Sequence, residues 1–217
     1  MIRMESGNQA LARRAPHDSA PDTNPQSPFW NGAPVTHFSG GFYGQPIAGH
    51  ASQVLLQWTP AHLYLLFVCP YERLHLRPNP SLAAETFGLW DWDVAEAFLG
   101  HDFANIRRYT EFEVSPQGEW VDLDIDRDRP VPEDGWVWQS GCSVAARIDA
   151  AAKVWYGFLR IPWPAIDPRP AAVGNRLRAN FFRCQGADPG RKYIAWQAPG
   201  RPSFHVPEAF GTLLLAH

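Results

Sequence analysis

Residues 108–126 read RYTEFEVSPQGEWVDLDID and contain two strand-like runs separated by a turn with Pro and Gly. In the second run, Val121, Leu123 and Ile125 alternate with aspartates, and successive side chains of a β-strand point to opposite faces. The three apolar side chains therefore share one face. We predict that this face contributes to the core while the aspartates face solvent.

Seven further runs of apolar or alternating residues recur along the chain between turn residues, which include 21 Pro and 17 Gly. Short strands with this spacing are typical of an antiparallel sandwich. We therefore predict an all-β fold, an antiparallel β-sandwich of jelly-roll type with few or no helices. One short helical turn is expected in PWPAIDP, which prolines bracket. The seven runs occupy residues 52–58, 62–70, 93–100, 142–149, 153–163, 175–184 and 211–217.

The length of 217 residues favours a single domain. Residues 1–27 are polar and show no apolar periodicity, so we predict a flexible leader followed by the domain at residues 28–217. Charged residues make up 19% of the chain and the net charge is −3. Binding to nucleic acid or to an anionic membrane would need a basic surface, so we expect neither partner.

The N-terminal residues lack the apolar region of a signal peptide, and no run of about 18 apolar residues occurs in the chain. Cys69, Cys142 and Cys184 lie far apart and form no CxxC pair, which favours a reducing compartment. We therefore expect a cytoplasmic protein.

Two features of the sequence bear on metal binding. Asp122, Asp124, Asp126 and Glu133 fall at positions 1, 3, 5 and 12 of an EF-hand loop, but Arg127 occupies the position that needs glycine. The eight histidines form neither HxH nor HExxH. The sequence therefore predicts no metal site from motif alone.

The tryptophans divide into two groups. Trp58, Trp138, Trp155 and Trp163 lie in or beside apolar runs and are expected in the core. The stretch FGLWDWDVAEAFLG, residues 87–100, instead places two tryptophans among acidic residues, where burial would trap charge without a partner. A partly exposed ring beside a carboxylate suits a sugar, whose C–H face lies on the ring while its hydroxyls donate to the carboxylate.

The chain resembles family 9 carbohydrate-binding modules, and especially free-standing bacterial family 9-like proteins, over about residues 50–215. The resemblance rests on several segments that occur in the order of the family. These are LLQWTPAHLYLLFVC, LWDWDVAEAFLG, YTEFEVSPQGEWVDLDID, WYGFLRIPWPAI, NRLRANFFRCQG with YIAWQA, and SFHVPEAFGTLLL.

The resemblance implies a β-sandwich that binds sugars or glycan ends without hydrolysing them and holds the sugar between two aromatic rings. By position, the first ring is Trp90, the second is Phe204, and Glu96 accepts hydrogen bonds from the hydroxyls. Further candidates are Trp92, which strand spacing places on the same face as Trp90, and Arg108, Asn180, Trp196 and His205. Arg183 is a weaker candidate than Asn180, because residues three apart in one strand face opposite sides.

The chain departs from the family pattern at several positions. Phe204 stands where xylanase-attached modules have Trp, Thr110 where they have a sugar-binding Arg, and Phe158 where a Glu is frequent. The calcium-associated opening motif is degenerate in SPFWNGAPVTHF, which leaves structural calcium without a clear motif. Relatives are usually exported, so an extracellular or periplasmic location is the alternative to the cytoplasm.

The leading hypothesis is therefore non-catalytic binding of a mono- or oligosaccharide in carbohydrate catabolism, in support of a glycoside hydrolase on a separate chain. One alternative is a degenerate sandwich that acts as a protein-interaction module. Another is a haem-binding relative, although the two methionines, Met1 and Met4, both lie in the predicted leader. Intrinsic glycoside hydrolysis, for which Glu96 and Asp93 form a candidate pair, ranks last.

Overall fold

The computed structural model describes residues 8–217, which fold into two β-layers with four single turns of 3-10 helix. The strands are β1 (Gln9–Arg14), β2 (Val35–Phe38), β3 (Ser52–Trp58), β4 (His62–Pro70), β5 (Val94–Gly100), β6 (Arg108–Val114), β7 (Trp120–Asp126), β8 (Ser143–Asp149), β9 (Val154–Pro162), β10 (Arg176–Gln185), β11 (Lys192–Ala195) and β12 (Gly211–Ala216). The helical turns are η1 (Pro28–Trp30), η2 (Leu89–Asp91), η3 (Trp163–Ala165) and η4 (Pro207–Ala209). The all-β prediction is confirmed, and η3 lies where the short turn was expected.

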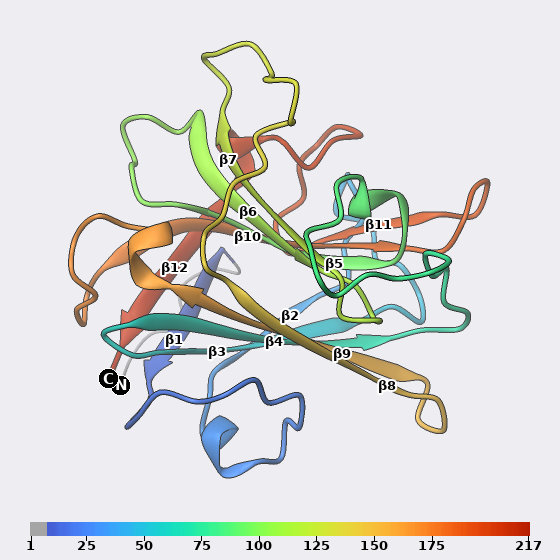
Figure 1. The fold of residues 1–217 in the computed structure, drawn as a ribbon, viewed down its shortest axis with the longest axis horizontal. Helices are drawn as coiled ribbons and strands as arrows, with labels where there is room; N and C mark the ends of the chain where they lie inside the picture. The colour runs from blue at the N-terminus through green and yellow to red at the C-terminus, as the bar shows by residue number, and fades with distance from the viewer. Residues whose placement is uncertain (1–7) are drawn as a thin grey trace.

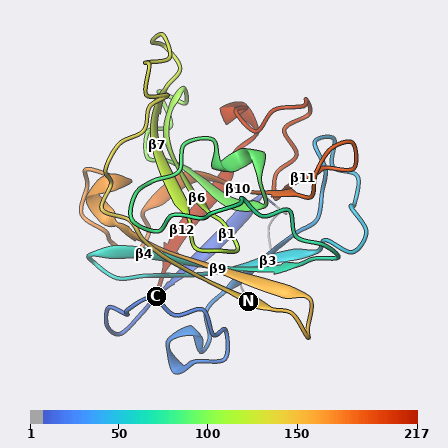
Figure 2. The same cartoon turned by 45° about the vertical axis from the view of Figure 1, so that its right-hand side comes forward.

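The strands follow the order β7-β6-β5-β10-β12-β1-β3-β4-β9-β8, with β11 paired to β10 and β2 paired to β3. Figure 1 shows β3, β4, β9 and β8 as one layer beneath β6, β5 and β10. Strand β1 connects the layers, because it pairs in parallel with both β12 and β3, and Figure 2 shows it beside them. All other strand pairs are antiparallel.

The main core lies between the two layers. It contains Leu56 and Trp155 from the lower layer and Ala97 and Phe112 from the upper layer, all fully buried. A second cluster covers the outer face of β7, β6, β5 and β10, and a third covers the outer face of β3, β4 and β9. Each layer therefore has apolar residues on both faces, and the second cluster positions the pocket described below.

The predicted boundary at residue 28 is wrong for the part of the leader that the structure describes. Residues 9–14 form β1, whose Ala10 and Ala12 are buried in the main core. Residues 1–7 of the predicted leader lie outside the described part of the chain. A six-residue strand with two alanines carries little apolar signal, and its neighbours in the sheet come from distant parts of the sequence.

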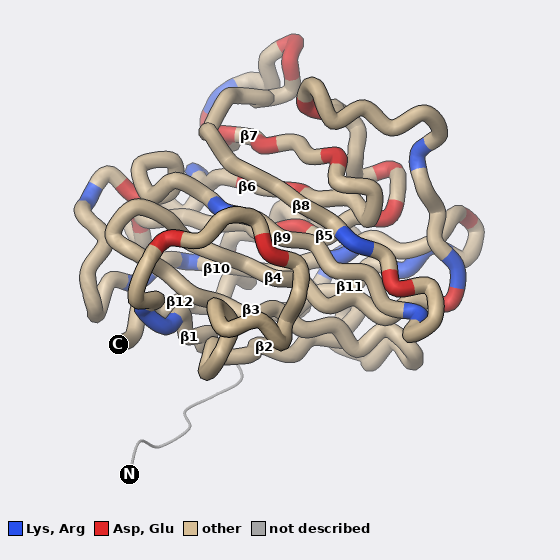
Figure 3. The backbone as a smooth tube through the Cα atoms, turned by 60° about the horizontal axis from the view of Figure 1, so that its bottom comes forward, with Lys and Arg blue, Asp and Glu red and all other residues tan. Residues whose placement is uncertain are grey.

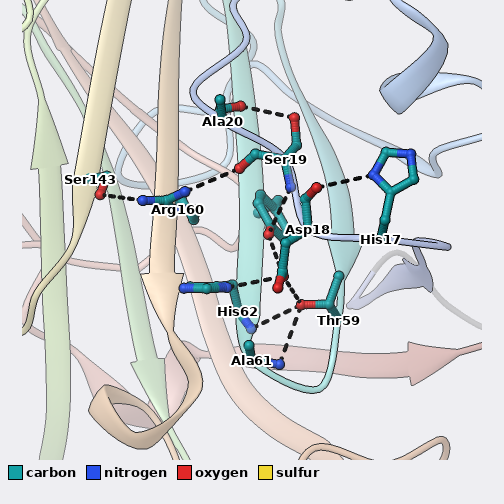
Figure 4. Close-up of polar contacts among 10 residues, drawn as sticks. His17, Asp18, Ser19, Ala20, Thr59, Ala61, His62, Ser143 and Arg160 are labelled. Atoms are coloured by element: carbon teal, nitrogen blue, oxygen red, sulfur yellow. Dashed lines mark hydrogen bonds and ion pairs between the residues drawn. The ribbon is translucent and has the colours of Figure 1, made fainter.

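The segment after β1 crosses the outer face of the lower layer, where Phe29 and Trp30 complete the third cluster. Figure 4 shows how Asp18 holds it. The Asp18 Oδ1 atom accepts hydrogen bonds from Thr59 Oγ1 at 2.5 Å and Tyr64 Oη at 2.7 Å, and lies 3.1 Å from His62 Nδ1. These contacts lower the pKa of Asp18 to about 2. The segment is thus attached to the sheet by apolar packing and a charged anchor.

On β7 the predicted core face is confirmed, because Val121, Leu123 and Ile125 are all buried. The opposite face was predicted to be exposed, and this is wrong for Asp122, which is only 2% exposed. Figure 3 shows the acidic positions along β7. The Asp122 carboxylate accepts a hydrogen bond from the Ser140 backbone N–H at 3.0 Å, because the segment that follows residue 137 folds back over this face.

The tryptophans expected in the core occupy it: Trp58, Trp155 and Trp163 are buried, and Trp138 packs against the main core half-buried. Among residues 8–217, none of the helical segments has the length and apolar character needed to cross a membrane.

Candidate functional site

A pocket of about 730 Å³ lies over the outer face of the upper layer. Its base is formed by side chains of β5, β6, β7 and β10, and its walls come from the loops above them. Six of the lining residues carry aromatic rings that belong to these loops and to β11: Phe42, Phe87, Trp90, Trp136, Tyr193 and Phe204.

Strand alternation explains which side chains reach the base. On β5, Glu96 and Phe98 face the pocket while Ala97 faces the main core. On β6, Glu111 faces the pocket and Phe112 the core. The same two-residue period on the adjacent strands brings Leu123, Ile125 and Cys184 to the base.

Trp90 lies in the pocket wall with its side chain half-buried. It belongs to η2, whose preceding residue Gly88 has a φ of 79°, a value that glycine adopts without strain. The Phe87 ring packs edge-on against Trp90, with the ring centroids 4.9 Å apart. Arg191 Nη2 donates a hydrogen bond to the Trp90 carbonyl oxygen at 2.5 Å. These contacts hold a large ring beside the opening of the pocket.

Phe204 also lines the pocket, as the resemblance implied for the second ring. One face of Phe204 stacks on Phe182 with a centroid distance of 4.2 Å and an interplanar angle of 17°. Tyr193 packs edge-on against it at 6.0 Å. Phe204 therefore has at most one ring face left for a ligand.

Three buried carboxylates lie at and beneath the base of the pocket. Glu96, Glu111 and Glu113 are 2%, 3% and 0% exposed, and one oxygen from each lies within 4.8 Å of the others. Burial raises the pKa of all three groups, to about 7 for Glu111 and well above the usual range for the other two. The neighbouring Glu111 carboxylate raises the pKa of Glu96 further, and Glu96 does the same to Glu113.

Few hydrogen-bond donors reach these carboxylates. Cys184 Sγ lies 3.4 Å from Glu96 Oε1 and donates to it. Glu111 Oε2 and both oxygens of Glu113 have no hydrogen-bond partner among the described residues. A proton on Glu113 would let it donate to Glu111, which is consistent with the directions of their pKa shifts. The three groups therefore cannot hold three negative charges without an added proton or cation.

Sequence reasoning missed Glu111 and Glu113. Both lie in the alternating run of β6, which was predicted as a strand without any role for its glutamates. The usable signal was their spacing: two glutamates on one strand face, beside a strand that carries Glu96.

His205 lines the pocket as predicted. Its Nδ1 atom lies 2.9 Å from the Tyr109 hydroxyl, and Arg127 donates to its backbone carbonyl oxygen at 2.6 Å. Burial and the nearby Arg127 charge lower the pKa of His205 to about 4. The ring is therefore neutral at pH 7, and because Nδ1 is paired with Tyr109, its Nε2 atom is the nitrogen left to hydrogen-bond a ligand.

Four other predicted site residues lie away from this pocket. Trp92 stacks on His75 with a centroid distance of 4.6 Å. Its predicted placement on the same face as Trp90 assumed an extended strand, whereas Trp90 lies in a helical turn. Arg108 forms an ion pair with Asp124 at 3.0 Å and lines a separate hollow.

Asn180 and Trp196 are also engaged elsewhere. The Asn180 amide donates to the Gln197 carbonyl oxygen and accepts from its N–H, both at 2.9 Å. Trp196 stacks on Phe181 at 5.3 Å. Arg183 faces the opposite side of β10 from Asn180, as strand spacing predicted, and donates to Ser52 Oγ at 3.1 Å.

The candidate hydrolytic pair of Glu96 and Asp93 does not share the pocket. Asp93 accepts hydrogen bonds from the backbone N–H groups of His75 and Gly186 and from the Gln185 amide. These contacts give Asp93 a structural role at the entrance to β5.

The protein is a β-sandwich with a cavity on one outer face, which is lined by aromatic rings and has carboxylates at its base. Its fold resembles that of family 9 carbohydrate-binding modules. A candidate carbohydrate-binding protein from Bacteroides uniformis ATCC 8492 superposes with a TM-score of 0.75 and 16% identity, over 97% of this chain and 100% of that one. A family 9 module from Caldicellulosiruptor kristjanssonii, solved with cellotriose, superposes with a TM-score of 0.66 and 13% identity, over 96% of this chain and 93% of that one. A family 9 module from the same organism, solved with glucose, superposes with a TM-score of 0.66 and 13% identity, over 95% of each chain.

No family model matches the chain, whereas sequence comparison finds relatives that match part of it. UPF0462 protein C4orf33 from Homo sapiens is 28% identical over 130 residues, which cover 56% of this chain and 58% of the human protein. A protein described as an extracellular protein from Arthroderma benhamiae is 25% identical over 134 residues, which cover 56% of this chain and 60% of the fungal protein. The match thus spans little more than half the length of these relatives.

Proposed function

We propose that this protein binds a mono- or oligosaccharide without hydrolysing it, in the pocket between Trp90 and Phe204. The observation that carries the proposal is that one cavity of about 730 Å³ brings together a half-buried tryptophan, a second ring and buried carboxylates. Its volume lies in the usual range for small-molecule sites. The solved relatives with cellotriose and glucose support sugar as the ligand class.

Each pocket residue has a distinct role in this proposal. The C–H face of the sugar stacks on Trp90, and the Phe204 ring closes the opposite side. Glu96 and His205 hydrogen-bond the hydroxyls at the base. Covering about 80 Å² of apolar ring surface would contribute about 2 kcal/mol to binding.

The biological setting follows from a binding role. A domain that holds a glycan end without cleaving it serves carbohydrate catabolism by presenting the glycan to a glycoside hydrolase on a separate chain. Release of reducing sugar by the purified protein, abolished in Glu96→Gln, would contradict the non-catalytic part of the proposal.

Isothermal titration calorimetry tests the binding itself. Glucose, xylose, cellobiose and xylo-oligosaccharides are titrated into the wild type, Trp90→Ala and Trp92→Ala. We expect saturable binding of at least one sugar, a loss of about thirtyfold in affinity for Trp90→Ala, and no change for Trp92→Ala, whose ring lies against His75. No heat with any sugar from folded wild type, or equal losses in both variants, would contradict the proposal; the first result would favour a protein-interaction module.

A further inference from the structure

A buried acid, the carboxylate of Glu113, lies beneath the base of the pocket. It is fully buried, and neither of its oxygens has a hydrogen-bond partner among the described residues. Leaving an acid in this state is costly unless something neutralises its charge. An unpartnered oxygen of Glu111 points to the same need.

Strand pairing fixes the geometry of the group. Glu96 on β5 lies directly opposite Glu113 on β6, and Glu111 is two residues away on the same face of β6. One oxygen from each carboxylate lies within 4.8 Å of the other two. This arrangement is set by the sheet and does not depend on a flexible loop.

Within residues 8–217, no Lys, Arg or His side chain pairs directly with these acids. Among the described residues, no ion pair involves Glu96, Glu111 or Glu113. Arg191 lies close enough to influence Glu96, but its guanidinium already donates to the carbonyl oxygens of Gly186, Trp90 and Trp92.

We propose that Glu96, Glu111 and Glu113 form a binding site for a hard divalent cation, with Ca²⁺ as the best fit, at the base of the pocket. Two oxygens on one Ca²⁺ ion lie no more than about 5 Å apart, because each Ca–O bond is about 2.4 Å long. The spacing of the three oxygens meets this limit. An all-carboxylate set is also the ligand type that hard cations prefer.

The pocket provides access to the site. Glu96 and Glu111 line the cavity, whereas Glu113 lies beneath them. Three carboxylates supply three to six oxygens, and Ca²⁺ takes six to eight, so water from the pocket completes the coordination. This site is separate from the EF-hand pattern beginning at Asp122 and from the degenerate opening motif, neither of which contributes a ligand.

Metal titration in the absence of sugar tests the site. The full chain is freed of metal with EDTA, dialysed, and titrated calorimetrically with CaCl₂, MgCl₂ and MnCl₂ at pH 7, and its Tm is measured with and without each salt. We expect one Ca²⁺ per chain and a higher Tm in Ca²⁺. Glu113→Gln keeps the shape of the side chain but removes its charge, and should weaken Ca²⁺ binding at least about tenfold and abolish the Tm increase.

Matched variants keep the result interpretable. Glu133→Gln, on an exposed loop, should bind Ca²⁺ as the wild type does. If Glu113→Gln does not fold, Glu111→Gln takes its place. The proposal is overturned if none of the three cations binds the wild type, or if Glu113→Gln binds Ca²⁺ normally. Because no sugar is present, failure here is distinguishable from failure of sugar binding, which is measured separately in EDTA.

Discussion

The Arg191 guanidinium donates a hydrogen bond to the carbonyl oxygen of Trp90 at 2.5 Å, and so ties the residue before β11 to the turn before β5. It also donates to the Trp92 carbonyl oxygen at 2.8 Å and, through Nη1, to that of Gly186 at 2.6 Å. One side chain thus fixes the backbone on both sides of Asp91 and connects it to the end of β10. The orientation of the proposed sugar platform depends on this arginine.

We expect Arg191→Gln to lower sugar affinity about tenfold, because Trp90 loses its backbone anchor while its ring remains. Arg191→Lys should behave similarly, since an ammonium group cannot span three carbonyl oxygens as a planar guanidinium does. Calorimetric titration with the sugar that binds the wild type measures the effect. The control is Arg108→Gln, which removes an exposed arginine paired with Asp124 and should leave affinity unchanged. Equal affinities for Arg191→Gln and wild type would show that Trp90 is held by packing alone.

A double-mutant cycle tests whether Trp90 and Phe204 contact the same sugar ring. If they do, losing the second ring should cost less binding free energy once the first is absent. The summed losses of binding free energy in the two single variants should then exceed the loss in the double variant by about 0.5–1 kcal/mol. The variants are Trp90→Ala, Phe204→Leu and the combination, each titrated calorimetrically. Leu retains apolar contact with Phe182, which limits the loss of stability. Strictly additive losses would indicate that the two rings contact different parts of the ligand.

His205 makes stability depend on pH. Its pKa is about 4 in the folded protein and about 6.5 when unfolded, so between these values the unfolded chain binds a proton that the native state excludes. Stability should therefore fall as pH decreases from about 6.5 to 4, by up to about 3 kcal/mol. The groups that face the ring are Arg127, whose charge opposes protonation, and the Tyr109 hydroxyl.

Urea unfolding of wild type and His205→Asn at pH 7, 6, 5 and 4 measures this contribution. The difference between the two proteins should narrow towards low pH, because Asn does not titrate. A constant difference across the series would mean that His205 is protonated equally in the folded and unfolded states.

Local sequence patterns predicted nine of the twelve strands in residues 8–217, missing β1, β2 and β11, and did not predict the contacts between distant segments. The alternation in residues 120–126 identified the core face of β7 correctly, because Val121, Leu123 and Ile125 follow the two-residue period of a strand. Asp122 was placed in solvent because nothing near it in sequence indicates that a later segment covers it. Strand β1 was missed for a similar reason, since its pairing with β12 joins the two ends of the described chain.

The site was predicted in part for the same physical reasons. Trp90, Glu96, Phe204 and His205 were chosen by position, and the structure brings them around one pocket. Trp92 was placed beside Trp90 by strand spacing, but a 3-10 turn rotates the two side chains apart. The acidic cluster arises from the register of β5 against β6, which no single-strand pattern specifies.

Asp18 provides a second pH-dependent contribution, through the segment that covers the lower layer. Its carboxylate accepts hydrogen bonds from Thr59 and Tyr64 and lies beside His62, so its pKa is about 2 instead of 3.8 (Figure 4). A lowered acid pKa contributes stability above the unfolded value of about 4, and this contribution is lost as pH falls from about 4 to 2. Half of the side chain is exposed, so solvent screening reduces the contribution to about 1 kcal/mol.

Asp18→Asn should therefore lower the Tm at pH 7 by about 2–4 °C and should have little effect near pH 2. It should also increase proteolytic cleavage between residues 15 and 33, because the segment loses its charged anchor. It keeps the apolar contacts of Phe29 and Trp30 and the hydrogen bonds that Gln57, Arg147 and Arg160 donate to its carbonyl oxygens. Calorimetry at both pH values and limited proteolysis followed by mass spectrometry provide the readouts. Asp128→Asn, which removes an exposed ion pair with Arg107, is the control and should change neither the Tm nor the proteolytic cleavage. A Tm decrease of the same size at pH 2 and pH 7 would show that Asp18 acts through packing or neutral hydrogen bonds, because its charge is largely lost at the lower pH.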